Sequence, residues 1–245
     1  MNADHVKAYY NQPGVVTDYA QAVSRIGLWR SEEKIFKRLF KPEQTLLELG
    51  CGTGRIAFGL WELGYKHLLG VDLARDMVEE ARRINKVLEY GVSFRVGDAT
   101  KLSYGDGEFD GAIFGFNGLM TIPRRENRRA ALREIRRVLR PGAWFAFTTH
   151  DRVSEKYRAF WVAEEQRWKE GRQSPELNEF GDRLLESPHG LSFIHIPTRE
   201  EILEDLAVTG WRYEVDAARA DLANEKDLVR VFGDDCRFWV AQNPA

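Results

Sequence analysis

Three acidic side chains stand where short apolar runs of the sequence end. Glu48 lies inside the run TLLEL, Asp72 ends HLLGVD and Asp98 follows VSFRVG. Parallel strands end at one shared edge of a sheet, so we expect the three carboxylates to lie close together there. Any one of them could be a solvated strand-end residue or a helix cap. Three at successive strand ends instead predict a binding site for a ligand rich in hydrogen-bond donors.

A glycine-rich turn, GCGTG, follows the first of these runs and places Gly50, Gly52 and Gly54 around Cys51. Glycine permits positive φ and puts no Cβ between the backbone and a ligand. A tight strand-to-helix turn without a ligand would explain these glycines equally well. The carboxylate of the neighbouring Glu48 is the feature that distinguishes the two interpretations.

The spacing G-x-G-x-G differs from the G-x-G-x-x-G of dinucleotide-binding turns. Glu48 beside the turn would repel a pyrophosphate and favour an ammonium group. Asp72 suits the hydroxyls of a ribose, and Asp98 can accept from an adenine amine next to the Ala99 amide. These features predict S-adenosylmethionine as the ligand. A dehydrogenase that binds a nicotinamide dinucleotide is the third-ranked alternative.

The elements that would position this site alternate between strand and helix patterns. Right-handed crossovers between such elements give a doubly wound α/β fold, with a mostly parallel sheet and helices on both faces. The expected strands cover residues 45–49, 67–71, 92–97, 109–116 and 143–150, and the expected helices 54–63, 73–90 and 126–140, the last ending at Pro141-Gly142.

Two segments fall outside this alternation within a single predicted domain, residues 1–245. Residues 1–40 read as helices and are expected to form a lid. Residues 151–190 are expected to form an inserted cover on the acceptor side, with a helix over 154–171 followed by a loop. A helix over 197–210 follows, with Thr198 as its N-cap and Gly210 at its end. Two closing strands are expected at 211–217 and 235–242.

Five motifs resemble, in order and spacing, those of class I S-adenosylmethionine-dependent methyltransferases, especially small bacterial members that act on small molecules. They are LLELGCGTGR, GVDLARDMV, FRVGDAT, FDGAIFGFN and LREIRRVLRPGAWFAFTTH. The resemblance covers residues 45–150 strongly and the closing strands loosely. It implies a seven-stranded Rossmann-like sheet with an antiparallel last strand, and S-adenosylmethionine as the methyl donor.

The resemblance also implies a role for each matching residue. Glu48 would hold the amino group of the cofactor, Asp72 the ribose, and Asp98 and Ala99 the adenine edge. The other implied cofactor contacts are Gly50, Cys51, Gly52 and Gly54 along the methionine, Leu73 and Met77 near the adenine, Phe116 and Asn117 beside the sulfonium, and Trp29 from the helix before the first strand.

Displacement at an activated methyl group depends mainly on alignment of the reactants, which can supply about 7–11 kcal/mol of a barrier. No conspicuous base is therefore required. His150, at the end of the fifth strand, is the candidate catalytic residue; a plain hydrogen-bonding role is the competing interpretation. Tyr9, Tyr10 and Tyr19 on the lid could contact the ligands or simply pack.

Aromatic residues of the insertion recur at helical spacing: Tyr157, Phe160, Trp161 and Trp168. They predict the buried face of a covering helix. If some of them line the acceptor site, the small-molecule acceptor is apolar or aromatic, and replacing Trp161 or Trp168 raises the acceptor KM alone.

The composition argues against nucleic acid as the partner of this chain. The net charge of −2 lacks the broad positive field of a nucleic-acid binder. The eight arginines within residues 124–140 are expected on a solvated face, and FGFN replaces the proline-rich tetrapeptide of nucleic-acid methyltransferases. RNA-directed methylation is thus not favoured but stays an alternative, as does a non-catalytic S-adenosylmethionine-binding protein.

The cysteines Cys51 and Cys236 lack metal-ligand spacing, so no metal is expected and the predicted setting is reduced and cytoplasmic. No apolar run reaches membrane-spanning length, and the N-terminus has no apolar signal core. A monomer or homodimer is expected.

Overall fold

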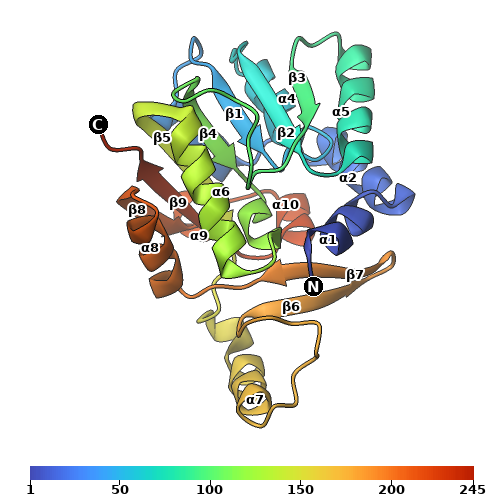
Figure 1. The fold of residues 1–245 in the computed structure, drawn as a ribbon. Coiled ribbons are helices and arrows are strands. Elements are labelled where there is room, and N and C mark those ends of the chain that lie inside the picture. Colours follow the sequence, from blue (N-terminus) through green and yellow to red (C-terminus); the bar gives the residue numbers. More distant parts are fainter.

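A seven-stranded sheet forms the centre of the computed structural model, which describes residues 1–245 (Figure 1). The strand order is β3-β2-β1-β4-β5-β9-β8. Neighbouring strands from β3 to β5 are parallel, whereas β9 is antiparallel to both its neighbours. The predicted fold class is confirmed. The strands are β1 Leu46–Leu49, β2 Leu68–Asp72, β3 Ser93–Val96, β4 Phe109–Phe114, β5 Leu139–Thr149, β8 Arg212–Ala218 and β9 Arg237–Gln242.

Helices cover both faces of this sheet because successive strand residues point to opposite sides. On the first face of the sheet, Leu46 and Ala146 belong to a buried cluster shared with the helices there. On the second face, Leu47 and Phe145 belong to a separate buried cluster. The first face carries α3 Arg30–Leu39, α4 Arg55–Glu62, α5 Arg75–Leu88 and α10 Asp227–Phe232, and the second carries α6 Arg125–Val138 and α8 Arg199–Val208. The predicted N-cap of α8 is confirmed, since the Thr198 side chain accepts from the Glu201 amide.

The boundary between α6 and β5 differs from the prediction. The helix ends at Val138, and Pro141 and Gly142 lie inside the strand. The Asn243 side chain donates to the carbonyls of Leu139 and Arg140, and Gly142 donates to the Asn243 carbonyl. These bonds from the chain end support extended backbone where the local pattern favoured helix. The pairing of β4 with β5 shifts register beside the proline, where a ladder donor is missing.

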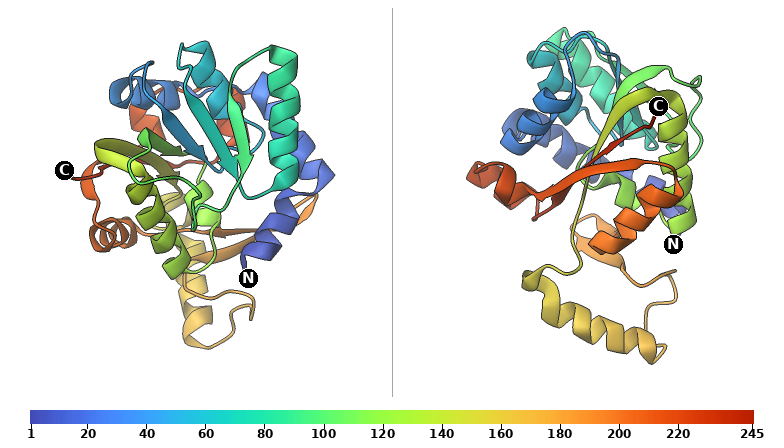
Figure 2. Two further views of the ribbon diagram at one scale, coloured as in Figure 1. Left: turned by 45° about the horizontal axis from the view of Figure 1, so that its top comes forward. Right: turned by 90° about the vertical axis from the view of Figure 1, so that its left-hand side faces the viewer.

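The insertion also differs from the prediction. A short turn, η2 Glu155–Tyr157, leads into α7 Arg158–Lys169, and the expected loop contains a hairpin of β6 Asp182–Ser187 and β7 Gly190–His195. The hairpin crosses below the carboxyl edge of the sheet, and α7 projects beyond it (Figures 1 and 2). The residues of the hairpin alternate only weakly between apolar and polar, which explains why the sequence pattern did not predict the hairpin.

Residues 1–40 are helical, with α1 Ala3–Tyr10 and α2 Pro13–Arg25 preceding α3. Three further short elements were not expected: η1 Gly118–Thr121 after β4, and α9 Arg219–Leu222 and α10 between β8 and β9. No helix combines the length and the apolar character that a membrane span requires.

Candidate functional site

A cavity of about 330 Å³ opens at the carboxyl ends of β1, β2 and β4 and is covered by α1 and α2; we call it the first cavity. Its volume is that of a small-molecule site. Three of the thirteen predicted cofactor residues do not line it: Gly54, Asn117 and Trp29. The ten that do are Glu48, Gly50, Cys51, Gly52, Asp72, Leu73, Met77, Asp98, Ala99 and Phe116.

Glu48 is a buried carboxyl group whose Oε2 atom has no hydrogen-bond partner. Burial raises its pKa to about 8, and the nearby Arg55 opposes this shift. Arg55 does not neutralise Glu48, because its guanidinium is bound to both carboxylate oxygens of Glu32 at 2.7 and 2.6 Å. A buried acceptor without a partner is costly. This site therefore suits a cationic donor group of a ligand, which would also ionise Glu48.

Asp72 joins the glycine turn to the turn after β2. One carboxylate oxygen accepts from the Gly52 amide and the other from the Ala74 amide, both at 2.8 Å. Burial raises the Asp72 pKa, and these backbone bonds oppose the shift. Each carboxylate oxygen has a second lone pair, so Asp72 can still accept from hydroxyls inside the cavity.

Asp98 lies exposed at the rim of the first cavity. Its Oδ1 atom accepts from the amide and the hydroxyl of Thr100, at 2.8 and 2.7 Å. The exposure of Asp98 and its bonds to Thr100 therefore agree with the interpretation as a solvated strand-end residue. Asp98 also lines the first cavity, so the two roles are compatible.

The predicted site residues outside the first cavity support its walls. Gly54 is left-handed at the start of α4, and a Cβ there would lie 2.7 Å from the Phe58 ring. Trp29 is buried at the N-cap of α3, between the guanidinium groups of Arg55 and Arg219, 4.9 and 5.1 Å from its ring.

Asn117 and His150 are hydrogen-bonded to each other. The Asn117 amide nitrogen lies 3.1 Å from His150 Nε2, and His150 Nδ1 lies 2.8 Å from the Asp235 carbonyl. A carbonyl only accepts, so Nδ1 carries the proton and Nε2 accepts from Asn117. His150 does not line the first cavity but lines a second one. Asn117 holds a positive φ of 60° directly after Phe116 at 48°.

Phe232 carried no signal in the sequence, whereas Tyr10 and Tyr19 were candidate ligand contacts on the predicted lid. Phe232 of α10 stacks on Phe116 with ring centroids 5.0 Å apart, although the two are far apart in the chain. Tyr10 and Tyr19 of the N-terminal helices also line the cavity. Burial raises the pKa of Tyr19 to about 12, so this phenol is neutral and can donate, accept or pack.

The arginines of residues 124–140 are less solvated than the sequence predicted. Arg128 is buried and pairs with Glu179 at 3.0 Å. Four others also form ion pairs with acids of the same chain: Arg125, Arg129, Arg137 and Arg140. This helix therefore offers few free cations to a phosphate backbone.

The strand order, the antiparallel β9 and the cavity beyond the strand ends define a class I S-adenosylmethionine-dependent methyltransferase fold. Within it, residues 46–142 match the family model of the methyltransferase domain. The chain is similar to an S-adenosylmethionine-dependent methyltransferase structure from Methanosarcina mazei, with 22% identity, a TM-score of 0.68, and coverage of 86% of this chain and 97% of that one.

Curated relatives include an O-methyltransferase of Pyrenophora dematioidea, 30% identical over 55% of this chain and 56% of the relative. Another is a demethylmenaquinone methyltransferase of Leptospira interrogans, 38% identical over 43% of each chain. The chain thus matches about half the length of these curated relatives.

Proposed function

We propose that this chain binds S-adenosylmethionine in the first cavity and transfers its methyl group to an oxygen atom of a small molecule, releasing S-adenosylhomocysteine and a proton. The observation that carries the proposal is Glu48, a buried carboxyl without a partner beside a glycine turn. The names of the O-methyltransferase relatives favour oxygen as the methylated atom.

The residues of the first cavity fit this cofactor. Glu48 would accept from its ammonium group, Asp72 from its ribose hydroxyls and Asp98 from its adenine amine. The bound cofactor would supply a methyl group on a positively charged sulfur, with a neutral leaving group. Phe116 and Phe232, stacked at one end of the cavity, would exclude water from the reacting atoms.

RNA-directed methylation is the less favoured alternative. Five of the eight arginines within residues 124–140 are engaged by acids of the chain itself. Affinity for RNA depends largely on free cations that replace the counterions of phosphates. A small-molecule acceptor needs no such surface.

Calorimetry with S-adenosylhomocysteine and with NADH tests the cofactor. We expect S-adenosylhomocysteine to bind and NADH not to bind. Glu48→Gln and Asp72→Asn should each weaken binding at least about tenfold, since each removes a charge-assisted hydrogen bond. The control Glu79→Gln changes an exposed acid of α5 and should leave affinity unchanged. Tighter binding of NADH would overturn the proposal.

Release of S-adenosylhomocysteine during a screen of hydroxylated small molecules tests the transfer itself. We expect at least one phenol or alcohol to be methylated by the wild type and more slowly by Asp72→Asn at limiting cofactor. Cofactor binding without methylation across the panel would instead favour a non-catalytic binding protein.

A further inference from the structure

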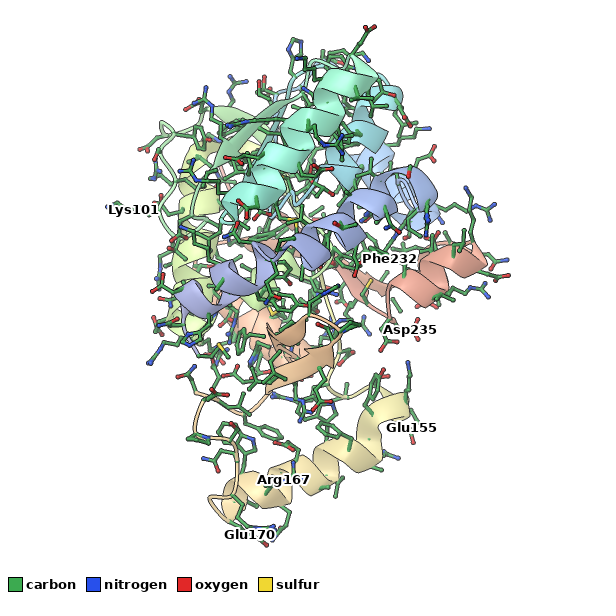
Figure 3. All side chains as sticks on the ribbon, turned by 90° about the vertical axis from the view of Figure 1, so that its right-hand side faces the viewer. Lys101, Glu155, Arg167, Glu170, Phe232 and Asp235 are labelled. Atoms are coloured by element: carbon green, nitrogen blue, oxygen red, sulfur yellow. The ribbon has the colours of Figure 1, made fainter.

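A second cavity of about 540 Å³ lies between the insertion and the ends of β5, β8 and β9. Tyr157, Phe160 and Trp161 line it from η2 and α7, and Arg183 lines it from β6. Figure 3 shows the region from the side, with Asp235 between Phe232 of α10 and Glu155 at the start of η2. Three of the four residues of the predicted aromatic stripe thus line a cavity, and Trp168 does not. Only Trp161 of these three is buried, so the predicted buried face is wrong for Tyr157 and Phe160.

Two short segments contribute to both cavities. Phe116 lines the first, and its neighbour Asn117 bonds to His150, which lines the second. Phe232 lines the first cavity, whereas Asp234 and Asp235 line the second. Residues 116–117 and 232–235 therefore connect the linings of the two cavities.

Arg183 is a partly buried cation that donates no hydrogen bond within the chain and forms one ion pair, with Glu164. Its guanidinium lies 4.2 Å from the Phe160 ring centroid, and its nearest acid, Glu164, is 3.5 Å away. Glu164 already accepts from Arg167 and from the Trp168 indole. Burial lowers the Arg183 pKa.

The other two arginines of the second cavity have acceptors within the chain. Arg219 donates to the Gly233 carbonyl at 2.9 Å, and Arg237 donates to Asp216. Arg183 is thus the arginine of this cavity that donates no hydrogen bond within the chain, whereas Arg237 leaves only its Nε donor without a partner.

We propose that the second cavity holds the methyl acceptor, and that this acceptor is a flat aromatic molecule bearing one carboxylate. This proposal rests on the proposed function, because a ligand of the second cavity is a methyl acceptor only if the chain transfers methyl groups. Arg183 would bind the carboxylate in a two-point contact, and Phe160 and Trp161 would pack against the ring. The acids Asp151, Asp234 and Asp235 also line the cavity, which disfavours a ligand with several negative charges such as a phosphate ester.

Calorimetry without the methyl donor tests this site with two probes, 6-hydroxy-2-naphthoate and 2-naphthol. The naphthoate should bind at least about tenfold more tightly than the naphthol, because the naphthol leaves the guanidinium unpaired. Arg183→Gln should abolish this preference. Arg167→Gln is the matched control, since Arg167 bonds the same Glu164 but lies outside the cavity, and it should retain the preference.

Phe160→Leu provides a second variant and should weaken both probes by a similar factor. Equal affinity for the two probes, no binding of either at millimolar concentration, or an unchanged preference in Arg183→Gln would overturn the proposal. Naphthoate binding that depends on Arg183, in a protein that binds no S-adenosylhomocysteine, would overturn the proposed function while leaving the aromatic-acid site in place.

Discussion

Glu48 links the folding energy of the chain to the charge of its ligand. Burial raises its pKa from 4.5 to about 8. Between these values the folded chain holds a proton that the unfolded chain has lost, so stability falls as the pH rises through this window. An ammonium group bound beside Glu48 would remove this disadvantage by stabilising the ionised form.

We expect the free energy of unfolding of the ligand-free protein to decrease from about pH 4.5 to pH 8 more steeply than that of Glu48→Gln. Glutamine keeps the shape of the side chain but does not titrate, so the difference between the two proteins isolates this group. Urea unfolding at several pH values measures it. Parallel pH profiles for the two proteins would show that Glu48 is already ionised at neutral pH.

Binding of S-adenosylhomocysteine at pH 7 should release close to one proton, because its ammonium group would ionise a Glu48 that is mostly protonated in the empty cavity. Calorimetry in buffers with different ionisation enthalpies counts the protons. The release should disappear in Glu48→Gln and at pH 9.5. A binding enthalpy that is the same in every buffer would contradict this expectation.

Among the elements, the β6–β7 hairpin depends on contacts that are distant in the chain. Asp182 is fully buried and accepts from the Asn178 and Glu179 amides and from His195. Glu179 in turn accepts a hydrogen bond from Arg128 of α6. The Glu179, Asp182 and His195 group has the composition of a metal site, but its polar atoms bond within the protein and link the hairpin to the preceding loop and to α6.

Arg128→Met should therefore destabilise the protein by about 3 kcal/mol, because breaking a buried ion pair leaves its partner without a counter-charge. Urea unfolding measures the loss. Arg133→Met is the control, since Arg133 is exposed on the same helix, and it should change stability by less than about 0.5 kcal/mol. Equal effects of the two substitutions would mean that the pair with Glu179 adds nothing.

The sequence predicted the central sheet and ten of the residues that line the first cavity because their signals are local. Glu48, the glycine turn and Asp72 sit at strand ends whose apolar patterns are clear. Phe232 and the Arg55–Glu32 pair were missed, since each acquires its place only through contacts between distant segments. The Pro141-Gly142 pair gave a wrong end for the predicted helix for the same reason, because Asn243 at the chain end supports the strand there.

In the whole molecule, the first cavity lies between two parts of unequal packing. The sheet side belongs to two large buried clusters, whereas α1 and α2 pack through a small separate cluster of Val15, Ala74 and Met77. Further contacts reach the hairpin tip, where Tyr9 donates to Ser187 at 3.0 Å. Figure 3 shows these N-terminal helices between α5 and the hairpin. A ligand that reaches Glu48 therefore passes the less tightly packed side.

We expect α1 and α2 to exchange their amide hydrogens quickly in the ligand-free protein and at least about tenfold more slowly with saturating S-adenosylhomocysteine. Segments with few buried contacts open most easily, and a ligand touching Tyr10 and Tyr19 adds the contacts that are missing. Hydrogen exchange followed by mass spectrometry measures the change. Peptides from α6, which lies in a large cluster on the other face of the sheet, are the internal control and should not change. Full protection of α1 and α2 without ligand would mean that they form a fixed wall and that the ligand enters elsewhere.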